Sequence, residues 1–293
     1  MNLGTTSKSP TSEHPLKIGT SSWKYDSWKG ILYSENVGSN YLKEYARHYN
    51  TVEIDQWFWS LFPDNVVLPN EKTIMEYLAS VPRDFRFAIK IPNSITLTHY
   101  YQKDKAKPVK NPHFLSIDLF IDFLKSIGKM HEWLGPLMFQ FEYLNKQKMP
   151  SQQAFLEQFG AFIAKCPPGY TYCVEIRNPN YLNKKYFEFL NANKLYHVFL
   201  QGYYMPPIFP LYAGYRQFIK DLAVIRLHGP DRAAIEKKTS SVWNEIVEPK
   251  DDELAQLAKM IDDLWSANVD VHVYVNNHYE SSAPKAIVEL LPK

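Results

Sequence analysis

Charged side chains stand next to apolar ones in several short runs of this sequence. Glu53 lies in "TVEID", Glu175 lies in "CVEIR", and Arg226 and His228 lie in "VIRLHG". Glutamate and histidine transfer protons, and arginine binds a carboxylate or a phosphate through two parallel hydrogen bonds. These residue types predict chemistry on a small anionic molecule, provided that the fold brings them together.

The runs have the alternation of β-strands, in which residues two apart share a face. In "CVEIR", Val174 and Ile176 form an apolar face, and Glu175 and Arg177 form a polar one. The same pattern recurs in six runs, and the polar face becomes charged towards the end of the strand. On these faces we expect Glu53, Asp55, Lys90, Gln140, Glu175, Arg177, Arg226, His228 and Asn276.

Eight strand candidates alternate with helix candidates along the chain. The predicted strands are Lys17–Ser22, Thr51–Asp55, Arg86–Ile91, Leu137–Phe141, Thr171–Arg177, Tyr196–Gln201, Ala223–Gly229 and Val271–Asn277. The predicted helices are Tyr41–Tyr49, Glu71–Ser80, Ser116–His131, Gln152–Ala164, Lys184–Asn191, Asp251–Ser266 and Ala283–Leu290. Asn70 and Ser151 are predicted to cap two of these helices, because their side chains can accept hydrogen bonds from the first turn.

This alternation predicts a parallel sheet covered by helices, and eight repeats favour a single (β/α)8 barrel of the TIM type. An open, doubly wound sheet is the alternative, but no glycine-rich dinucleotide loop follows the first strand. Two segments interrupt the rhythm, residues 100–114 and 202–216. Both are predicted to be long loops, which often carry function.

In a TIM-type barrel the active site lies at the end to which the strands point, so the polar faces would meet there. We assign catalytic roles to Glu53, Glu175 and His228. Substrate binding is assigned to Asp55, Lys90, Gln140, Arg177, Arg226 and Asn276, with Arg226 holding the anion.

The alternative is that these charges only pair with one another inside the barrel. Glu175 would then pair with Arg226, or Glu53 with Lys90. Because burying charges costs several kcal/mol each, pairing alone is a poor reason to collect so many of them. The sequence therefore favours a binding or catalytic site over a purely structural charge network.

The segment after the first strand is rich in aromatic residues and reads "WKYDSWKG" from Trp23 onwards. In a barrel it would lie at the catalytic end. Ser21, Trp23 and Tyr25 are therefore predicted to line the mouth of the site. Trp28 precedes the apolar "ILY" and is predicted to anchor the loop by packing.

Composition sets broad limits on the protein. The chain has 293 residues, 45% of them hydrophobic, and a formal net charge of +2. We expect a disordered tail over residues 1–15 and one domain over 16–293. The small net charge does not predict a basic surface that binds nucleic acid. No apolar run reaches the roughly 20 residues that span a bilayer. A membrane partner is therefore not expected. The chain has only two cysteines, Cys166 and Cys173, and Cys173 lies in a predicted strand, so a disulfide framework is not expected and a cytoplasmic protein is indicated. The oligomeric state stays open.

Several motifs together resemble a known family. They are "IGTSSWKYDSWKGILY", "YARHYNTVEID", "FAIKIPNSITLTH", "PLMFQF", "CVEIRNPNY", "VIRLHGP" and "VYVNNHYESSAPKAI". In this order they are similar to the YecE-like family, domain of unknown function 72, from about Lys17 to Leu290. The resemblance implies a TIM-type barrel and brings no established activity.

Three other functions are open at this stage. In a metal-assisted hydrolase of the endonuclease-IV-like kind, Glu53, Asp55, Glu175 and His228 would supply ligands, although the neighbouring cations and the lack of an HxH or HExxH pair weigh against it. No metal ligand is therefore assigned and the cofactor is unknown. A glycosidase would use Glu53 and Glu175 as its carboxyl pair. A binder of single-stranded nucleic acid would stack bases on exposed aromatic residues and use the lysines of "KDKAKPVK".

Overall fold

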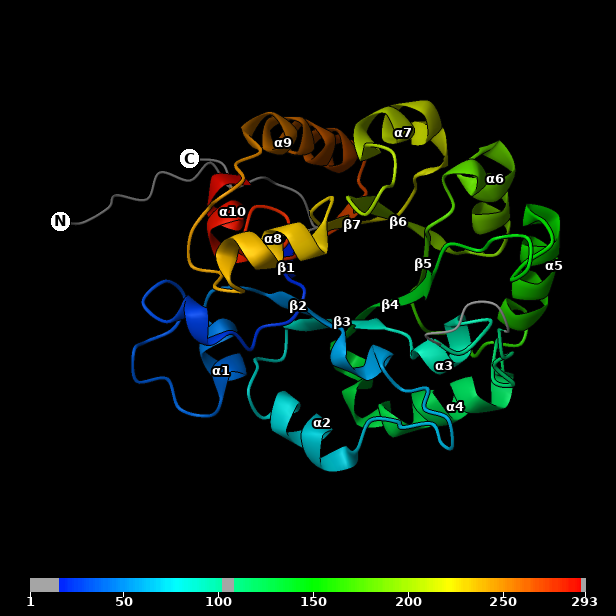
Figure 1. Ribbon diagram of the computed structural model, residues 1–293, viewed down its shortest axis with the longest axis horizontal. Helices are drawn as coiled ribbons and strands as arrows, with labels where there is room; N and C mark the ends of the chain where they lie inside the picture. The colour runs from blue at the N-terminus through cyan, green and yellow to red at the C-terminus, as the bar shows by residue number, and fades with distance from the viewer. Residues whose placement is uncertain (1–15, 102–107, 291–293) are drawn as a thin grey trace.

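Eight parallel strands form one sheet in the computed structural model, which describes residues 16–101 and 108–290 (Figure 1). The order of the strands around the sheet is β1-β8-β7-β6-β5-β4-β3-β2. Their bounds are β1 (Lys17–Thr20), β2 (Thr51–Ile54), β3 (Arg86–Lys90), β4 (Leu134–Phe141), β5 (Tyr172–Ile176), β6 (Tyr196–Gln201), β7 (Leu222–Leu227) and β8 (Asp270–Val275). The predicted TIM-type barrel is confirmed.

The first and last strands of this order, β1 and β2, close the barrel through one point. Ser21 and Glu53 form a single parallel bridge, and the Ser22 amide donates to the Glu53 carbonyl at 3.0 Å. This junction is narrow because β1 is only four residues long. The seam of the barrel therefore passes through two of the residues predicted to form the site.

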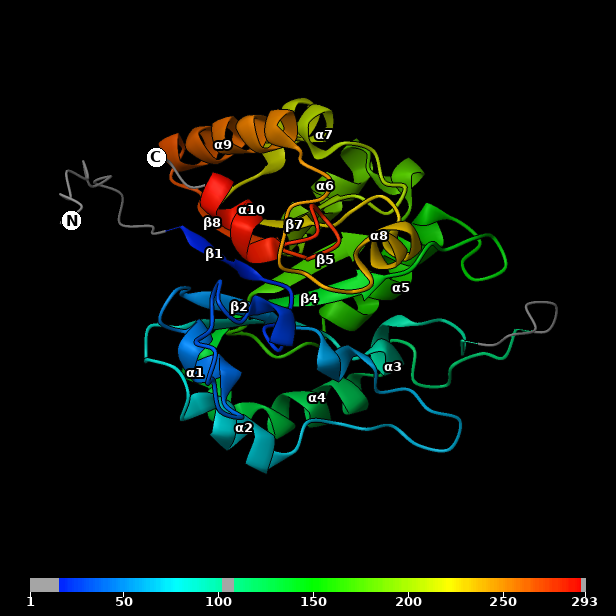
Figure 2. The same cartoon turned by 60° about the vertical axis from the view of Figure 1, so that its left-hand side comes forward.

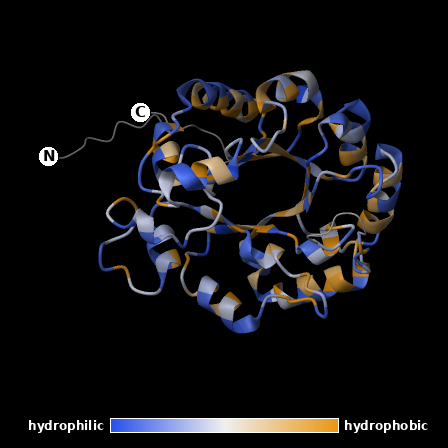
Figure 3. Ribbon diagram, viewed as in Figure 1, coloured by the Kyte–Doolittle hydropathy of each residue, from blue (hydrophilic) through white to orange (hydrophobic). Residues whose placement is uncertain are grey.

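Helices cover the outside of the barrel, as Figures 1 and 3 show. In the described residues they are α1 (Tyr41–Tyr45), α2 (Glu71–Leu78), α3 (Asn93–Thr96), α4 (Ile117–Ser126), α5 (Gln152–Ile163), α6 (Lys184–Ala192), α7 (Ile208–Tyr215), α8 (Arg232–Thr239), α9 (Asp251–Ser266) and α10 (Ala283–Leu290). Asn70 accepts from the Thr73 amide at 2.9 Å and Ser151 from the Ala154 amide at 3.1 Å, so both predicted caps are confirmed.

Three helices were not predicted, namely α3, α7 and α8. The prediction of a continuous loop over 202–216 is wrong, because α7 begins at Ile208. Its sequence "IFPLYAGY" has Pro210 in the first turn, where proline is tolerated, and is too uniformly apolar to show a helical period. The predicted tail over 1–15 and residues 102–107 of the other predicted loop lie outside the described residues.

The interior of the barrel has an apolar layer beneath a polar one. Ala88, Met138, Cys173, Val198, Leu222, Val224 and Tyr274 form a buried cluster separate from the larger core between sheet and helices. Residues two positions further along the same strands include Lys90, Gln140, Glu175 and Arg226. Because residues two apart share a face of a strand, the polar layer lies directly above the apolar one, towards the strands' carboxyl ends.

The loops that follow the strands gather at one end of the barrel. Figure 2 shows α3 and α8 apart from each other, both at the end to which the strands point. In the part of the chain that the structure describes, no helix has both the length and the apolar character needed to cross a membrane.

Candidate functional site

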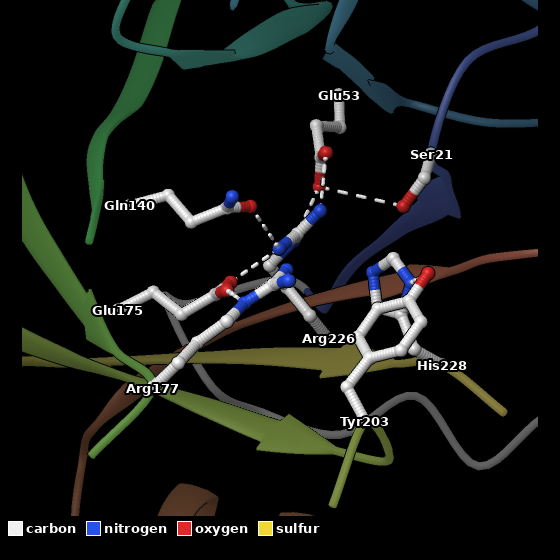
Figure 4. Close-up of polar contacts among 8 residues, drawn as sticks. All are labelled: Ser21, Glu53, Gln140, Glu175, Arg177, Tyr203, Arg226 and His228. Carbon is white, nitrogen blue, oxygen red and sulfur yellow. Dashed lines mark hydrogen bonds and ion pairs between the residues drawn. The ribbon is translucent and has the colours of Figure 1, made fainter. Parts of the chain in front are cut away.

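Arg226 of β7 lies at the centre of the polar layer and is 2% exposed. Its Nε and Nη2 atoms donate to the two carboxylate oxygens of Glu53, each at 2.7 Å. Its Nη1 atom donates to Gln140 Oε1 at 3.3 Å and to the carboxylate of Glu175. Figure 4 shows these three side chains converging on one guanidinium group from β2, β4 and β5.

The electrostatics of this cluster keep its charges in place. Burial alone would raise the pKa of Glu175, but the charges of Arg226, Arg177 and Lys90 outweigh it and lower this pKa to about 2. Burial alone would lower the pKa of Arg226, but Glu175 and Glu53 outweigh it and raise this pKa above its usual range. Arg226 and Glu175 are therefore both ionised at neutral pH.

This arrangement gives Arg226 a different role from the one expected. Four of its five N–H groups are used inside the protein, so it has little left to offer a substrate. The pairing of Glu175 with Arg226, set out above as the alternative, is present. Glu53 pairs with Arg226 and not with Lys90.

Arg177 follows β5 and borders the buried cluster. Its Nε atom donates to Glu175 Oε1 at 3.0 Å, and its guanidinium carbon lies 4.8 Å from the centre of the Tyr203 ring. Its side chain is 27% exposed, and its terminal nitrogens donate no hydrogen bond to a described residue. The guanidinium group of Arg177 is thus held at its Nε atom, while its terminal nitrogens can still bind a ligand.

His228 lies beyond the end of β7, buried and beside Tyr203. Its Nδ1 atom is 3.0 Å from the Tyr203 hydroxyl, whereas its Nε2 atom is buried with no partner among residues 16–101 and 108–290. Burial, together with the charges of Arg226, Arg177 and Lys90, holds the pKa of His228 well below its usual value. The ring is therefore neutral, and the Tyr203 hydroxyl can either donate to it or accept from it.

Lys90 and Asp55 stand at the ends of β3 and β2. The Lys90 amine lies 4.0 Å from the centre of the Phe58 ring. Burial and the charge of Arg226 lower its pKa to about 8, although Glu53 and Asp55 oppose them. Burial and the charge of Glu53 raise the pKa of Asp55. Both groups are therefore closer to neutrality than on the protein surface.

The residues after β1 divide between the site and the outer packing. Ser21 Oγ donates to Glu53 Oε2 at 3.4 Å. Tyr25 is partly buried, with its ring 4.7 Å from that of Trp28, and burial and the charge of Asp55 raise its pKa. Trp28 is fully buried, so its predicted packing role is confirmed.

Trp23 is placed differently from the expectation that it lines the mouth. It is 6% exposed, belongs to the core between sheet and helices, and packs edge-on against Tyr77 of α2 at 5.0 Å. Ser22, just before it, has a φ of 72°, and this left-handed turn follows directly after the seam. A strand pattern extended past the true end of β1 at Thr20 could not anticipate that turn.

Asn276 also lies outside the cluster around Arg226. Its side-chain oxygen accepts from the His278 amide at 2.9 Å and so caps the turn that follows β8. The structure therefore brings together Ser21, Glu53, Gln140, Glu175, Arg177 and Arg226, with His228 joined to Arg177 through Tyr203. Tyr203 was not assigned to the site from the sequence, and Gly202 before it was the available sign of a constrained turn.

Metal binding finds little support in the donors present. No three His, Cys, Asp or Glu side chains are grouped to hold an ion in the described ranges. Glu53 and Glu175, which were considered as ligands, are both paired with Arg226. A metal would have to displace these buried ion pairs.

The comparisons with known proteins identify the family. A family model described as "Protein of unknown function DUF72" matches residues 17–293. The chain belongs to the DUF72 family. The YecE proteins of Escherichia coli K12 and O157:H7 are each 24% identical to it over 170 residues, which are 58% of this chain and 51% of theirs. The chain thus spans about half the length of these curated relatives.

Solved structures share the fold. A DUF72 family protein from Enterococcus faecalis V583 is 18% identical, with a TM-score of 0.68 and coverage of 94% of each chain. One from Thermotoga maritima MSB8 is 19% identical, with a TM-score of 0.66 and coverage of 94% of this chain and 98% of that one. A glycoside hydrolase is 10% identical, with a TM-score of 0.50 over 88% and 87%. At these identities the likeness extends to the barrel and not to chemistry.

Proposed function

We propose that this DUF72 protein is an enzyme that acts on a small molecule bearing a carboxylate or a phosphate, at the carboxyl end of the barrel. One observation carries the proposal. Arg177 is held by Glu175 and by the ring of Tyr203, yet its terminal nitrogens have no described partner. A guanidinium fixed in this way suits two-point binding of a planar or tetrahedral anion.

His228 supplies the proton transfer in this proposal. The Nε2 atom of its neutral ring has no partner in the part of the chain that the structure describes, and the Tyr203 hydroxyl lies 3.0 Å from the other ring nitrogen. The same Tyr203 side chain contacts Arg177, so it positions both the group that binds the anion and the imidazole of His228. Arg226 with Glu53 and Glu175 forms the rigid floor beneath them. The cluster thus separates binding by Arg177 from proton transfer by His228.

The glycosidase alternative fits this site less well. A glycosidase needs one carboxyl group that is protonated near neutral pH and a second one that is ionised. Glu175 has a pKa of about 2, and both Glu53 and Glu175 are held by Arg226. Neither is placed to deliver a proton to a leaving group.

Thermal unfolding with inorganic phosphate, citrate and pyruvate tests the proposal. At about 100 times its dissociation constant, a bound anion should raise the midpoint of unfolding by roughly 5 °C. Arg177→Met should abolish this shift. Arg216→Met is the matched control, because Arg216 also pairs with a carboxylate, Asp263, and lies 5.7 Å from a tyrosine ring. If no anion stabilises the wild-type protein, or if both variants respond like it, the proposal fails.

A second candidate is a barrel that binds rings by stacking, including the bases of single-stranded nucleic acid. Among the described residues, nine of the eleven exposed large hydrophobic side chains lie in segments between a strand and the next long outer helix, including Trp59, Tyr101, Tyr143 and Tyr204. Aromatic rings on such a surface stack bases regardless of sequence. Fluorescence titration with a short single-stranded oligonucleotide tests this candidate, and Trp59→Ala should weaken the binding, whereas Met75→Ala on the outer helix α2 should not.

A further inference from the structure

Lys90 differs from the lysines that form ion pairs in the described structure. Six lysines pair with carboxylates, and all but one of them are more than 30% exposed. Lys90 lies on the inner face of β3, where it pairs in register with Met138 of β4. Its amine makes no hydrogen bond or ion pair with a described residue and instead lies over the Phe58 ring. An amine in this position is available for chemistry.

The surroundings of Lys90 favour its uncharged form, in which the nitrogen has a lone pair. The side chain is partly buried, and this burial and the charge of Arg226 lower its pKa to about 8. Lysines activated in this way, by burial next to another cation, condense with carbonyl compounds. The charges of Glu53 and Asp55 oppose the shift. Both the charged and the uncharged form of the amine are therefore populated near neutral pH.

We propose that Lys90 forms a Schiff base with the carbonyl carbon of a small 2-oxo acid, whose carboxylate is held by Arg177. The inference rests on the proposed anion site and adds the reactive group to it. Lys90 of β3 lies opposite Met138 of β4, and Glu175 of β5, two residues before Arg177, lies opposite Gln140 of the same strand. The two cations therefore flank β4 towards the carboxyl end of the barrel, and both charges act on Glu175 and on His228. A 2-oxo acid joins its carboxylate directly to its carbonyl carbon and so suits two neighbouring cations.

The covalent step needs no oxidant or reductant. The Lys90 lone pair forms a C–N bond to the carbonyl carbon while the carbonyl π electrons move to oxygen, which takes up a proton. The nitrogen then gives up a proton, and the new hydroxyl group takes up a second proton. Its C–O bond breaks as the nitrogen lone pair forms the C=N bond, so that water leaves and the protonated imine remains. In this proposal Asp55 and the neutral His228 exchange these protons. The Asp55 carboxyl and the Lys90 amine shift each other's pKa, and the charge of Lys90 also acts on His228.

Borohydride trapping tests the assignment. The full-length protein is incubated with pyruvate, reduced with sodium borohydride and digested, and the labelled peptide is found by mass spectrometry. We expect one reduced adduct per chain on the peptide containing Lys90, at least tenfold above any other lysine. Lactate, which has the carboxylate but no carbonyl group, should give none.

Two variants and one control define the result. Lys90→Met and Lys90→Arg should both lose the adduct, and the arginine variant keeps the charge over Phe58 if the methionine variant folds poorly. Lys17→Met is the matched control and should keep the adduct, because Lys17 is also a partly buried lysine with a lowered pKa but lies at the opposite end of the barrel.

The failures of the two proposals are distinguishable. If pyruvate raises the unfolding temperature of the wild-type protein but no adduct forms, the anion site stands and the Schiff base is wrong. If adducts spread over surface lysines, or survive in Lys90→Arg, the assignment to Lys90 is also wrong. If pyruvate neither stabilises the protein nor reacts with it, both proposals fail for this class of substrate.

Discussion

At the scale of single residues, the central feature is that one arginine forms ion pairs with two glutamates. Arg226 donates to both oxygens of Glu53 and to Glu175, and all three side chains are at most 2% exposed. The attraction within a buried ion pair offsets the cost of desolvation only when the other donors and acceptors of the two groups also form hydrogen bonds. Here Gln140 accepts a hydrogen bond from Arg226, and Arg177 donates one to Glu175.

Glu175 makes the stability of the protein depend on acid pH. Its pKa in the folded protein is about 2, below the ordinary value of 4.5, so its contribution is fully present above pH 4.5 and is lost as the pH falls through 2. We expect the free energy of unfolding to drop by on the order of 3 kcal/mol across this window. Urea unfolding at a series of pH values measures it. Glu175→Gln should flatten the profile, and Glu71→Gln, at an exposed ion pair, should leave it unchanged.

At the scale of elements, the turn after β6 decides how His228 is oriented. Gly202 has a φ of 120°, and Tyr203 and Tyr204 after it have φ values of 51° and 63°. A side chain on Gly202 would place its Cβ 2.2 Å from the His228 carbonyl oxygen. The turn thus packs against the backbone of the next strand's end and carries Tyr203 onto the imidazole.

Gly202→Ala should therefore damage the site as well as the fold. The alanine would be strained at this φ and would push the turn away from His228, at a cost of about 1–3 kcal/mol. The anion-induced shift in unfolding temperature should shrink with it. Gly38→Ala is the control, because a Cβ there meets nothing within 4 Å. Equal behaviour of the two variants in urea unfolding and phosphate titration would contradict this role for the turn.

At the scale of the whole molecule, the Arg226 cluster ties the barrel together where the strand ladder is weakest. β1 and β2 meet at a single bridge, between Ser21 and Glu53. Glu53 is held at the same time by Arg226 of β7 and by the hydroxyl of Ser21. The polar layer therefore connects β1 and β2 to the far side of the barrel through side chains.

Removal of Arg226 should then destabilise the whole barrel. Arg226→Met leaves two buried carboxylates without their partner, and we expect a loss of about 3–5 kcal/mol in chemical denaturation. Adding Glu53→Leu and Glu175→Leu to this variant should recover most of the loss, because it removes the unpaired charges. A single variant as stable as the wild type would show that the ion pairs are not needed for closure.

The sequence by itself determined the strands, the polar inner faces and the barrel. These follow from the alternation of side chains along each strand, as "CVEIR" and "VIRLHG" show, and alternation is a local property. The sequence also predicted that Glu53, Gln140, Glu175 and Arg226 lie on the inner faces, towards the ends of their strands.

Only the tertiary structure decided which of these groups face each other. Partners depend on register and on where the barrel closes. Arg226 is therefore paired with both glutamates, while the terminal nitrogens of Arg177 donate to no residue of the described ranges. Left-handed turns at Ser22 and at Tyr203 sent Trp23 into the outer packing and Tyr203 onto His228. Such turns and pairings are set by contacts between residues far apart in the chain, which no local pattern encodes.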